Sequence, residues 1–196
     1  MKIYIIDNSP DKLKYAELFF YGCDDVECVC LDFDVFMHNY DVDCVVSPAN
    51  AFGVMDGGYD EAIIAYFGQQ LQDRVQQYIV DHFYGEQPVG TSFIIDSGRS
   101  GCTLIHTPTV RTPQDINEPL VVYQCMRTTL MCAIENNVES ILIPLFGGGY
   151  GYLHPKLIAE LMWNAYEQIK KPPSMIDRAY MEEHDIVIDE TGIFRM

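Results

Sequence analysis

The chain has 196 residues, 48% of them hydrophobic, so it is long enough to bury a full core and short enough to favour a single domain. Acidic residues outnumber Lys and Arg by 29 to 12, and the resulting net charge of -17 argues against a nucleic-acid partner. No apolar run reaches the roughly 18 residues of a membrane span, and the first residues do not resemble an export signal. We therefore expect a cytoplasmic protein without a membrane partner.

The seven cysteines are an odd number, and several lie inside apolar patterns, such as Cys44 and Cys125. This distribution favours buried free thiols in a reducing compartment. No Cys-x-x-Cys or His-x-x-x-His spacing occurs, and Cys28-x-Cys30 would only place two thiols on one face of a strand. We expect no metal and no cofactor.

Short apolar runs alternate with amphipathic helical patterns along the chain. Ser9-Pro10-Asp11 supplies a helix N-cap, a proline at the first helical position and an early carboxylate. Gly68 is suited to end one helix, and Pro172-Pro173 prevents the helix that begins at Pro155 from continuing. The predicted helices cover residues 10–20, 60–67, 71–79, 122–133 and 155–171, and the predicted strands cover residues 2–6, 26–31, 43–46, 90–95, 102–106, 140–145 and 185–188.

This alternation predicts an α/β fold in which residues 1–196 form one domain, with helices on both faces of a mixed, mostly parallel sheet. The strand runs lack a clean alternation of polar and apolar residues, as expected for strands that are covered on both faces. Ligands of such folds bind outside the carboxyl ends of the strands. A functional site is therefore expected at that edge.

Two glycine-bearing loops each follow an apolar strand and precede a helix. The first covers about residues 47–59 and contains Asn50, and the second covers about residues 146–152. Glycines let backbone N–H groups approach a ligand closely, and the positive end of a helix favours an anion. With so few basic residues, an anion would have to be held by backbone amides and helix dipoles. The pattern predicts a diphosphate clamp, although it matches neither a P-loop nor a Rossmann fingerprint.

Several segments resemble the macrodomain family, whose members bind ADP-ribose. Val46-Ser47-Pro48-Ala49-Asn50 is similar to the family's V-N-A-A-N, and residues 57–63 are similar to its G-G-V-D-x-A-I, with the same ten-residue step from Asn50 to Asp60. Residues 88–91, 104–107 and 143–151 resemble its T-G-x-A, V-I-H-T and F-P-x-x-S-T-G-x-Y-G segments, in the family's order. The resemblance implies a three-layer macrodomain-like fold and a ligand that is ADP-ribose, free or attached.

The resemblance also implies a role for each matched position. Asp34, placed at the end of an apolar strand, would accept a hydrogen bond from the adenine amino group, with Asp32 as its rival. Asn50 would bind the distal ribose, Tyr150 would pack on that sugar, and Phe194 is a candidate to cover the adenine. The implied ligand contacts are Asp34, Ser47, Ala49, Gly53, Val54, Gly57, Gly58, Phe146, Gly147, Gly148, Gly149, Tyr150 and Gly151.

The sequence departs from the family pattern at three places. Ser47 replaces the first Asn, Met55-Asp56 interrupts the first glycine run, and glycines replace the Ser-Thr of the second loop. Catalysis would be attack of water on the anomeric carbon of the distal ribose, with the water polarised by Asp60 or by a substrate phosphate and the sugar fixed by Asn50. Asp56 is the alternative group for orienting that water.

Three functions remain open. The first is hydrolysis of ADP-ribosyl linkages, the second is removal of phosphate from ADP-ribose 1''-phosphate, and the third is binding without turnover. Other polar residues have simpler interpretations: His106 as a packed strand residue, His154 as a helix-start residue and Arg111 as the partner of a carboxylate.

Overall fold

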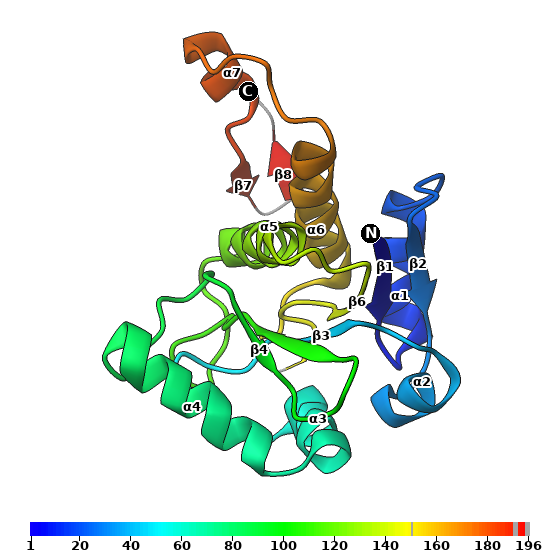
Figure 1. The fold of residues 1–196 in the computed structure, drawn as a ribbon. Coiled ribbons are helices and arrows are strands. Elements are labelled where there is room, and N and C mark those ends of the chain that lie inside the picture. Colours follow the sequence, from blue (N-terminus) through cyan, green and yellow to red (C-terminus); the bar gives the residue numbers. More distant parts are fainter. Residues whose placement is uncertain (150, 190–191, 195–196) are drawn as a thin grey trace.

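The computed structural model describes residues 1–149, 151–189 and 192–194. At their centre is a six-stranded sheet in the order β2-β1-β6-β3-β5-β4 (Figure 1). Every neighbouring pair is parallel except β4 and β5, which are antiparallel. The strands are β1 Lys2–Ile6, β2 Val26–Val29, β3 Cys44–Ser47, β4 Phe93–Asp96, β5 Thr103–His106 and β6 Ser140–Pro144.

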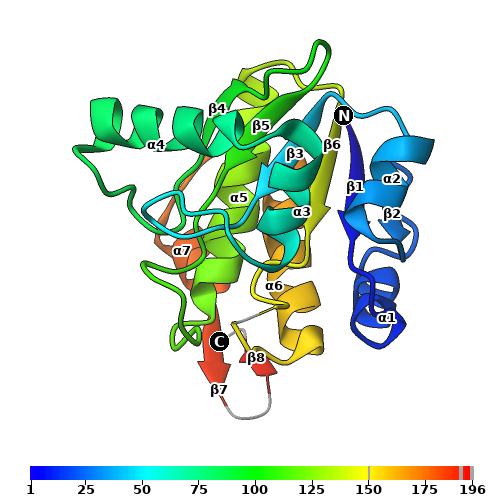
Figure 2. The same ribbon diagram turned by 90° about the horizontal axis from the view of Figure 1, so that it is seen from below.

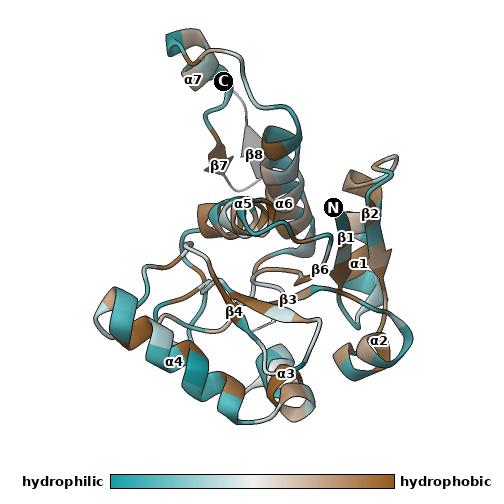
Figure 3. Ribbon diagram, in the orientation of Figure 1, coloured by the Kyte–Doolittle hydropathy of each residue, from teal (hydrophilic) through white to brown (hydrophobic). Residues whose placement is uncertain are grey.

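Helices cover both faces of the sheet, which confirms the three-layer fold. The helices are α1 Pro10–Phe19, α2 Phe33–Asn39, α3 Gly58–Phe67, α4 Gln70–Phe83, α5 Leu120–Glu135 and α6 Pro155–Lys170. One apolar cluster joins the sheet to α1, α5 and α6, and a second joins it to α2, α3 and α4. Figures 1 and 2 show α3 and α4 on one side of the strands and α5 and α6 on the other. Figure 3 shows the polar stretches of α4 on the outside of this layer.

The helix boundaries follow the local signals in the sequence. Pro10 and Pro155 each occupy the first turn of a helix, where the missing N–H of proline costs nothing. Gly68 ends α3 with a φ of 95°, a conformation that other residues rarely adopt. Leu71, Val75 and Ile79 form the buried stripe of α4.

The region after β2 differs from the prediction. The strand ends at Val29 rather than at residue 31, and a short helix, α2, follows it. Asp34 is therefore exposed in the first turn of α2, and its expected place at a strand end is wrong. The physical reason is that Phe33 and Phe36 lie three residues apart and are both buried, which is a helical spacing.

The last predicted strand also lies elsewhere. Strand β7 covers Val187–Asp189 and pairs only with β8, Gly192–Phe194, in a separate two-stranded sheet. In Figure 1 this pair and α7, Arg178–Glu183, stand apart from the main sheet. Ile186 and Ile188 pack against the apolar cluster that contains α5 and α6, which accounts for the position of this segment outside the main sheet.

The strand order also decides which loops meet. Strands β1, β6 and β3 are parallel neighbours, so their carboxyl ends lie at one edge of the sheet. The turn after β1 and the two glycine-bearing loops therefore gather at that edge. Within the described residues, no helix is both long enough and apolar enough to cross a membrane.

Candidate functional site

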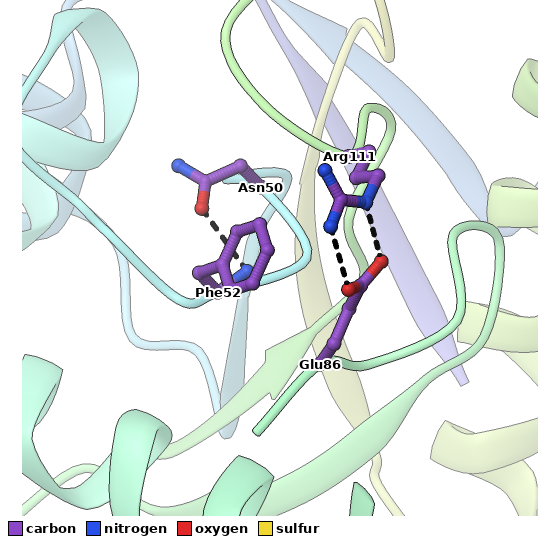
Figure 4. A network of polar contacts seen from close by, with 4 residues as sticks. All are labelled: Asn50, Phe52, Glu86 and Arg111. Atoms are coloured by element: carbon purple, nitrogen blue, oxygen red, sulfur yellow. Dashed lines mark hydrogen bonds and ion pairs between the residues drawn. The ribbon is translucent and has the colours of Figure 1, made fainter. Parts of the chain in front are cut away.

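The first loop, residues 48–57 between β3 and α3, is organised by the side chain of Asn50. This side chain is only 5% exposed. Its Oδ1 accepts hydrogen bonds from the backbone amides of Phe52, at 3.1 Å, and Val54, at 3.4 Å, while its Nδ2 donates to the Val54 carbonyl at 2.9 Å. Figure 4 shows the bond from the Phe52 amide to the Asn50 carbonyl oxygen. Asn50 thus fixes the shape of the loop by bonding backbone groups that would bind water in an exposed turn.

The first loop also packs closely on α4. A Cβ atom on Gly53 would lie 2.7 Å from Val75 Cγ1 and 2.9 Å from Ile79 Cδ1, and the φ of Gly53 is +65°. The Met55 amide donates to Gln72 Oε1 at 2.8 Å. The amides of Gly53 and Val54 are paired inside the loop, whereas the amides of Asp56 and Gly57, just before α3, form no hydrogen bond with a described residue.

Residues 107–117 connect the two glycine-bearing loops. Asn50 forms a β-bridge with Val110, and the Ala51 amide donates to the Val110 carbonyl. At the other end of the segment, the Ile116 amide donates to the Gly151 carbonyl at 3.2 Å. The sequence did not predict this role, although an apolar residue, Ile116, in a polar, proline-bearing segment is a signal for it, and Ile116 is buried.

Arg111 reinforces the same connection from outside. Its guanidinium forms two hydrogen bonds with the Glu86 carboxylate, at 2.7 and 2.9 Å, and lies 5.2 Å from the centre of the Phe52 ring (Figure 4). The prediction that Arg111 pairs with a carboxylate is confirmed. The bidentate pair joins the segment that carries Arg111 to Glu86, which follows α4, and the contact with Phe52 joins it to the first loop.

Asp60 lies in the first turn of α3 and points toward the sheet. The Ser47 hydroxyl, itself buried, donates to Asp60 Oδ1 at 2.6 Å. Burial raises the pKa of Asp60 to about 7, and the hydrogen bond from Ser47 opposes that rise. The carboxyl of Asp60 therefore titrates in the range where a general base is useful. Asp56, in contrast, is exposed on the loop.

The second loop, residues 145–154 between β6 and α6, is built by close backbone packing. A Cβ on Gly151 would lie 2.8 Å from the Gly147 carbonyl oxygen and 2.7 Å from Ile116 Cδ1. The Gly148 amide donates to the Leu145 carbonyl at 2.9 Å, whereas a side chain on Gly149 would enter open space. Within the described part of the loop, the amides of Gly147, Gly149 and Gly151 form no hydrogen bond.

Buried groups near the two loops are part of the scaffold. His106 is fully buried on β5, its Nδ1 lies 2.6 Å from Gln87 Oε1, and burial lowers its pKa to about 3. The imidazole is neutral, and the prediction of a packed strand residue is confirmed. His154 is confirmed as a helix-start residue, because its Nδ1 accepts from the Lys156 amide at the beginning of α6.

Comparison with known proteins identifies this arrangement. The sequence model of the Macro domain family matches residues 46–162, which include both glycine-bearing loops. The chain belongs to this family.

Its relatives and structural neighbours agree. An uncharacterized protein of Aquifex aeolicus is 26% identical over 74% of this macrodomain and 84% of its own length. The macrodomain of Mycobacterium tuberculosis DarG is 20% identical, with a TM-score of 0.58 over 67% of this chain and 85% of its own. The Oceanobacillus iheyensis macrodomain with ADP is 21% identical, with a TM-score of 0.58 over 66% and 70%. A mutant of that protein with ADPR has a TM-score of 0.59 at 20% identity, over 67% and 73%. These neighbours establish the fold.

The structure of this macrodomain divides the predicted contact residues into groups. Ala49, Val54 and Gly57 are partly accessible around the first loop, and Gly58, with a φ of +58°, begins α3. Ser47 and Phe146 are fully buried, so their side chains face the core. Tyr150 lies outside the described residues, and so does the side chain of Phe194.

Asp32, the rival of Asp34 in the sequence, lies between β2 and α2. Asp32 is the N-cap residue of α2, and its Oδ1 accepts from Asn8 Nδ2 at 2.8 Å. Asn8 belongs to the turn after β1, the neighbouring strand. Asp32 therefore lies at the same edge of the sheet as the two loops, whereas Asp34 is one turn further along a helix.

Metal clusters and surface hollows are the other places at which a ligand could bind. Among residues 1–149, 151–189 and 192–194, no group of three or more His, Cys, Asp or Glu residues is placed to hold a metal ion. Two surface hollows, of about 180 and 490 Å³, lie along α5 and α6 and share Tyr123 and Gln168, so neither is formed by the glycine-bearing loops.

Proposed function

We propose that this macrodomain binds ADP-ribose, free or attached to another molecule, between the loops that follow β3 and β6. The observation that carries the proposal is that these two strands are parallel neighbours, so both loops lie at one edge of the sheet. Two seats for phosphate on adjacent strands suit a diphosphate, whose two charges are separated by a single bridging oxygen. Solved structures of family members with ADP and ADPR support this choice of ligand.

The amides that remain unpaired define the two phosphate seats. Asp56 and Gly57 offer amides at the N-terminus of α3, where the helix dipole also favours an anion. Gly147, Gly149 and Gly151 offer amides in the second loop. Gly53 would contribute by letting the loop approach α4, and Val54 through its half-buried side chain.

The two ends of the ligand follow from the strand order. Asp32, beside the turn after β1, would accept a hydrogen bond from the adenine amino group, in place of Asp34. Asn50 would bind the distal ribose with its second Nδ2 hydrogen while the first remains bonded to the Val54 carbonyl.

A second candidate function is hydrolysis of the linkage between ADP-ribose and an acceptor. The observation that favours it is Asp60, a buried carboxyl whose pKa of about 7 suits a general base at neutral pH. Asp60 would accept a proton from water as it attacks the anomeric carbon, and amides around the diphosphate would hold the substrate in position.

Calorimetric titration with ADP-ribose tests the binding proposal. We expect a dissociation constant in the micromolar range, equivalent to about -7 to -9 kcal/mol, because the net charge of -17 opposes an anion at long range. Failure to bind at millimolar ADP-ribose would reject the proposal.

Activity is tested in parallel by incubating the protein with mono-ADP-ribosylated substrates of several linkages and with ADP-ribose 1''-phosphate. Release of ADP-ribose supports hydrolysis, and release of phosphate supports the phosphatase alternative. Binding without release of either product identifies a binding module.

A further inference from the structure

The first 45 residues lie before the part of the chain that matches the family, and they bring a positive charge to the second loop. Strand β1 is paired with β6 from Lys2↔Ser140 to Ile6↔Pro144. The two strands are parallel, so the turn after β1 lies beside the loop after β6. The helix that follows this turn, α1, carries Lys12 in its first turn.

Lys12 makes a direct contact with the second loop. Its Nζ donates to the Gly148 carbonyl at 2.7 Å, across 136 residues of sequence. The side chain is half-buried, and an ammonium group has three N–H donors, of which this bond uses one. The remaining donors are available beside the unpaired amides of Gly147 and Gly149.

The charge of Lys12 is also left without a carboxylate partner. Six other Lys and Arg side chains form ion pairs with Asp or Glu, but within the described residues Lys12 forms none. A lysine in the first turn of a helix opposes the helix dipole, which is unfavourable there. Lys12 therefore lies where its charge is unfavourable for the helix, yet its ammonium group contacts a glycine-bearing loop. Such a position suits a lysine whose charge binds a ligand.

The carboxylate of Asp7 lies at the same loop, so a phosphate bound there needs the positive charge of Lys12. A Cβ on Gly148 would lie 3.5 Å from Asp7 Oδ2, so the Asp7 carboxylate borders the second loop. Asp7 also accepts from the Ser9 amide at 2.8 Å, which fixes its orientation in the turn. Without a cation, a phosphate bound at this loop would face Asp7 alone in a protein that is already strongly acidic.

We propose that Lys12 binds a phosphate of the ligand at the second loop and selects for a diphosphate-bearing ligand over an uncharged nucleoside. This inference rests on the proposed function, and it adds to the amides a charged side chain that the family-matching part of the chain does not supply.

The test compares Lys12→Met and Lys12→Arg with the unmodified protein, using calorimetric titration with ADP-ribose and with adenosine at 50 mM and 500 mM NaCl. We expect Lys12→Met to weaken ADP-ribose binding about tenfold at low salt, since it removes one charge-assisted contact. At high salt the difference should shrink to about threefold or less, because salt screens that charge. Lys12→Arg should stay within about threefold of the unmodified protein.

Lys14→Met is the matched control. Lys14 lies on the same helix, but its Nζ pairs with Asp11 at 3.0 Å and is exposed. Its removal should leave the affinity within about twofold, and Lys12→Met should leave adenosine binding unchanged. Thermal unfolding of each variant verifies that α1 remains packed.

The outcomes distinguish a phosphate-binding role of Lys12 from a structural role. Equal loss of ADP-ribose and adenosine binding, independent of salt, would assign Lys12 a merely structural role and overturn the proposal, as would unchanged ADP-ribose affinity in folded Lys12→Met. If the unmodified protein binds adenosine but not ADP-ribose, the phosphate role is overturned together with the proposed function. If the unmodified protein binds ADP-ribose and both Lys12 variants bind it with the same affinity, the proposed function stands and this inference alone fails.

Discussion

The two glycine-bearing loops occupy equivalent places at the ends of neighbouring strands, but they are held in different ways. The first is shaped by side chains: Asn50 bonds three backbone groups of the loop, and Gln72 bonds a fourth. The second is shaped by the absence of side chains, because Gly147 and Gly151 approach each other to within a distance that no Cβ would permit. The first loop therefore depends on the buried side-chain amide of Asn50, and the second loop depends on several glycines.

The largest expected effect concerns the chemistry beside the first loop. If Asp60 is the general base, Asp60→Asn should lower turnover about a hundredfold or more, while ADP-ribose affinity changes little. The measurement is product release under single-turnover conditions. Asp56→Asn is the control, since Asp56 is exposed on the same loop. An equal loss in that variant would move the water-orienting role to Asp56.

The dependence of the first loop on one side chain is tested by Asn50→Ala. The change removes all three bonds made by the buried amide, so we expect ADP-ribose affinity to fall about thirtyfold and the free energy of unfolding to fall by about 2 kcal/mol. Calorimetry and urea denaturation measure the two effects. Gln72→Ala removes a single bond and should cost less in both. Equal effects would show that Asn50 does not dominate the loop.

The second loop is tested by a pair of glycine substitutions. A Cβ at Gly149 enters open space, so Gly149→Val should weaken ADP-ribose binding about tenfold by blocking the approach of the phosphate, without a change in stability. A Cβ at Gly151 meets the Gly147 carbonyl oxygen, so Gly151→Ala should lower the free energy of unfolding by about 1–3 kcal/mol. Urea denaturation and calorimetry distinguish the two. Normal binding by Gly149→Val would remove this loop from the site.

Gly148 is a less selective position for such a test. A Cβ there would lie 3.0 Å from the Leu145 carbonyl oxygen, which accepts from the Gly148 amide. A bulky residue would therefore disturb the turn itself, and any loss of binding would combine two causes.

The last expected effect is on stability as a function of pH. Burial raises the pKa of Asp60 from 3.8 to about 7, so the native state favours the neutral carboxyl. The stabilisation this gives is complete below about pH 4 and is lost as the pH rises through about 7. Urea denaturation should show that the stability of Asp60→Asn relative to the unmodified protein rises by about 2–3 kcal/mol between pH 5 and pH 8. A constant difference would indicate an ordinary pKa for Asp60.

The sequence determined the local structure well where one segment carries the whole signal. Pro10, Gly68 and Pro155 mark helix boundaries through backbone geometry, and the structure has them at those boundaries. The buried stripe of α4 and the strand before each glycine loop were likewise readable, because burial on a helix or in a covered strand leaves a periodic trace. The ten-residue step from Asn50 to Asp60 was one of several features that resembled the family.

Tertiary structure alone decided how these segments meet. Insertion of β1 between β2 and β6 placed Lys12 at Gly148 and brought Asn8, in the turn after β1, to Asp32. The buried bond from Ser47 to Asp60 and the bridge formed by residues 107–117 also join positions far apart in the chain. Strand order and long-range contacts depend on which surfaces bury each other, and a single sequence records the composition of those surfaces but not their pairing.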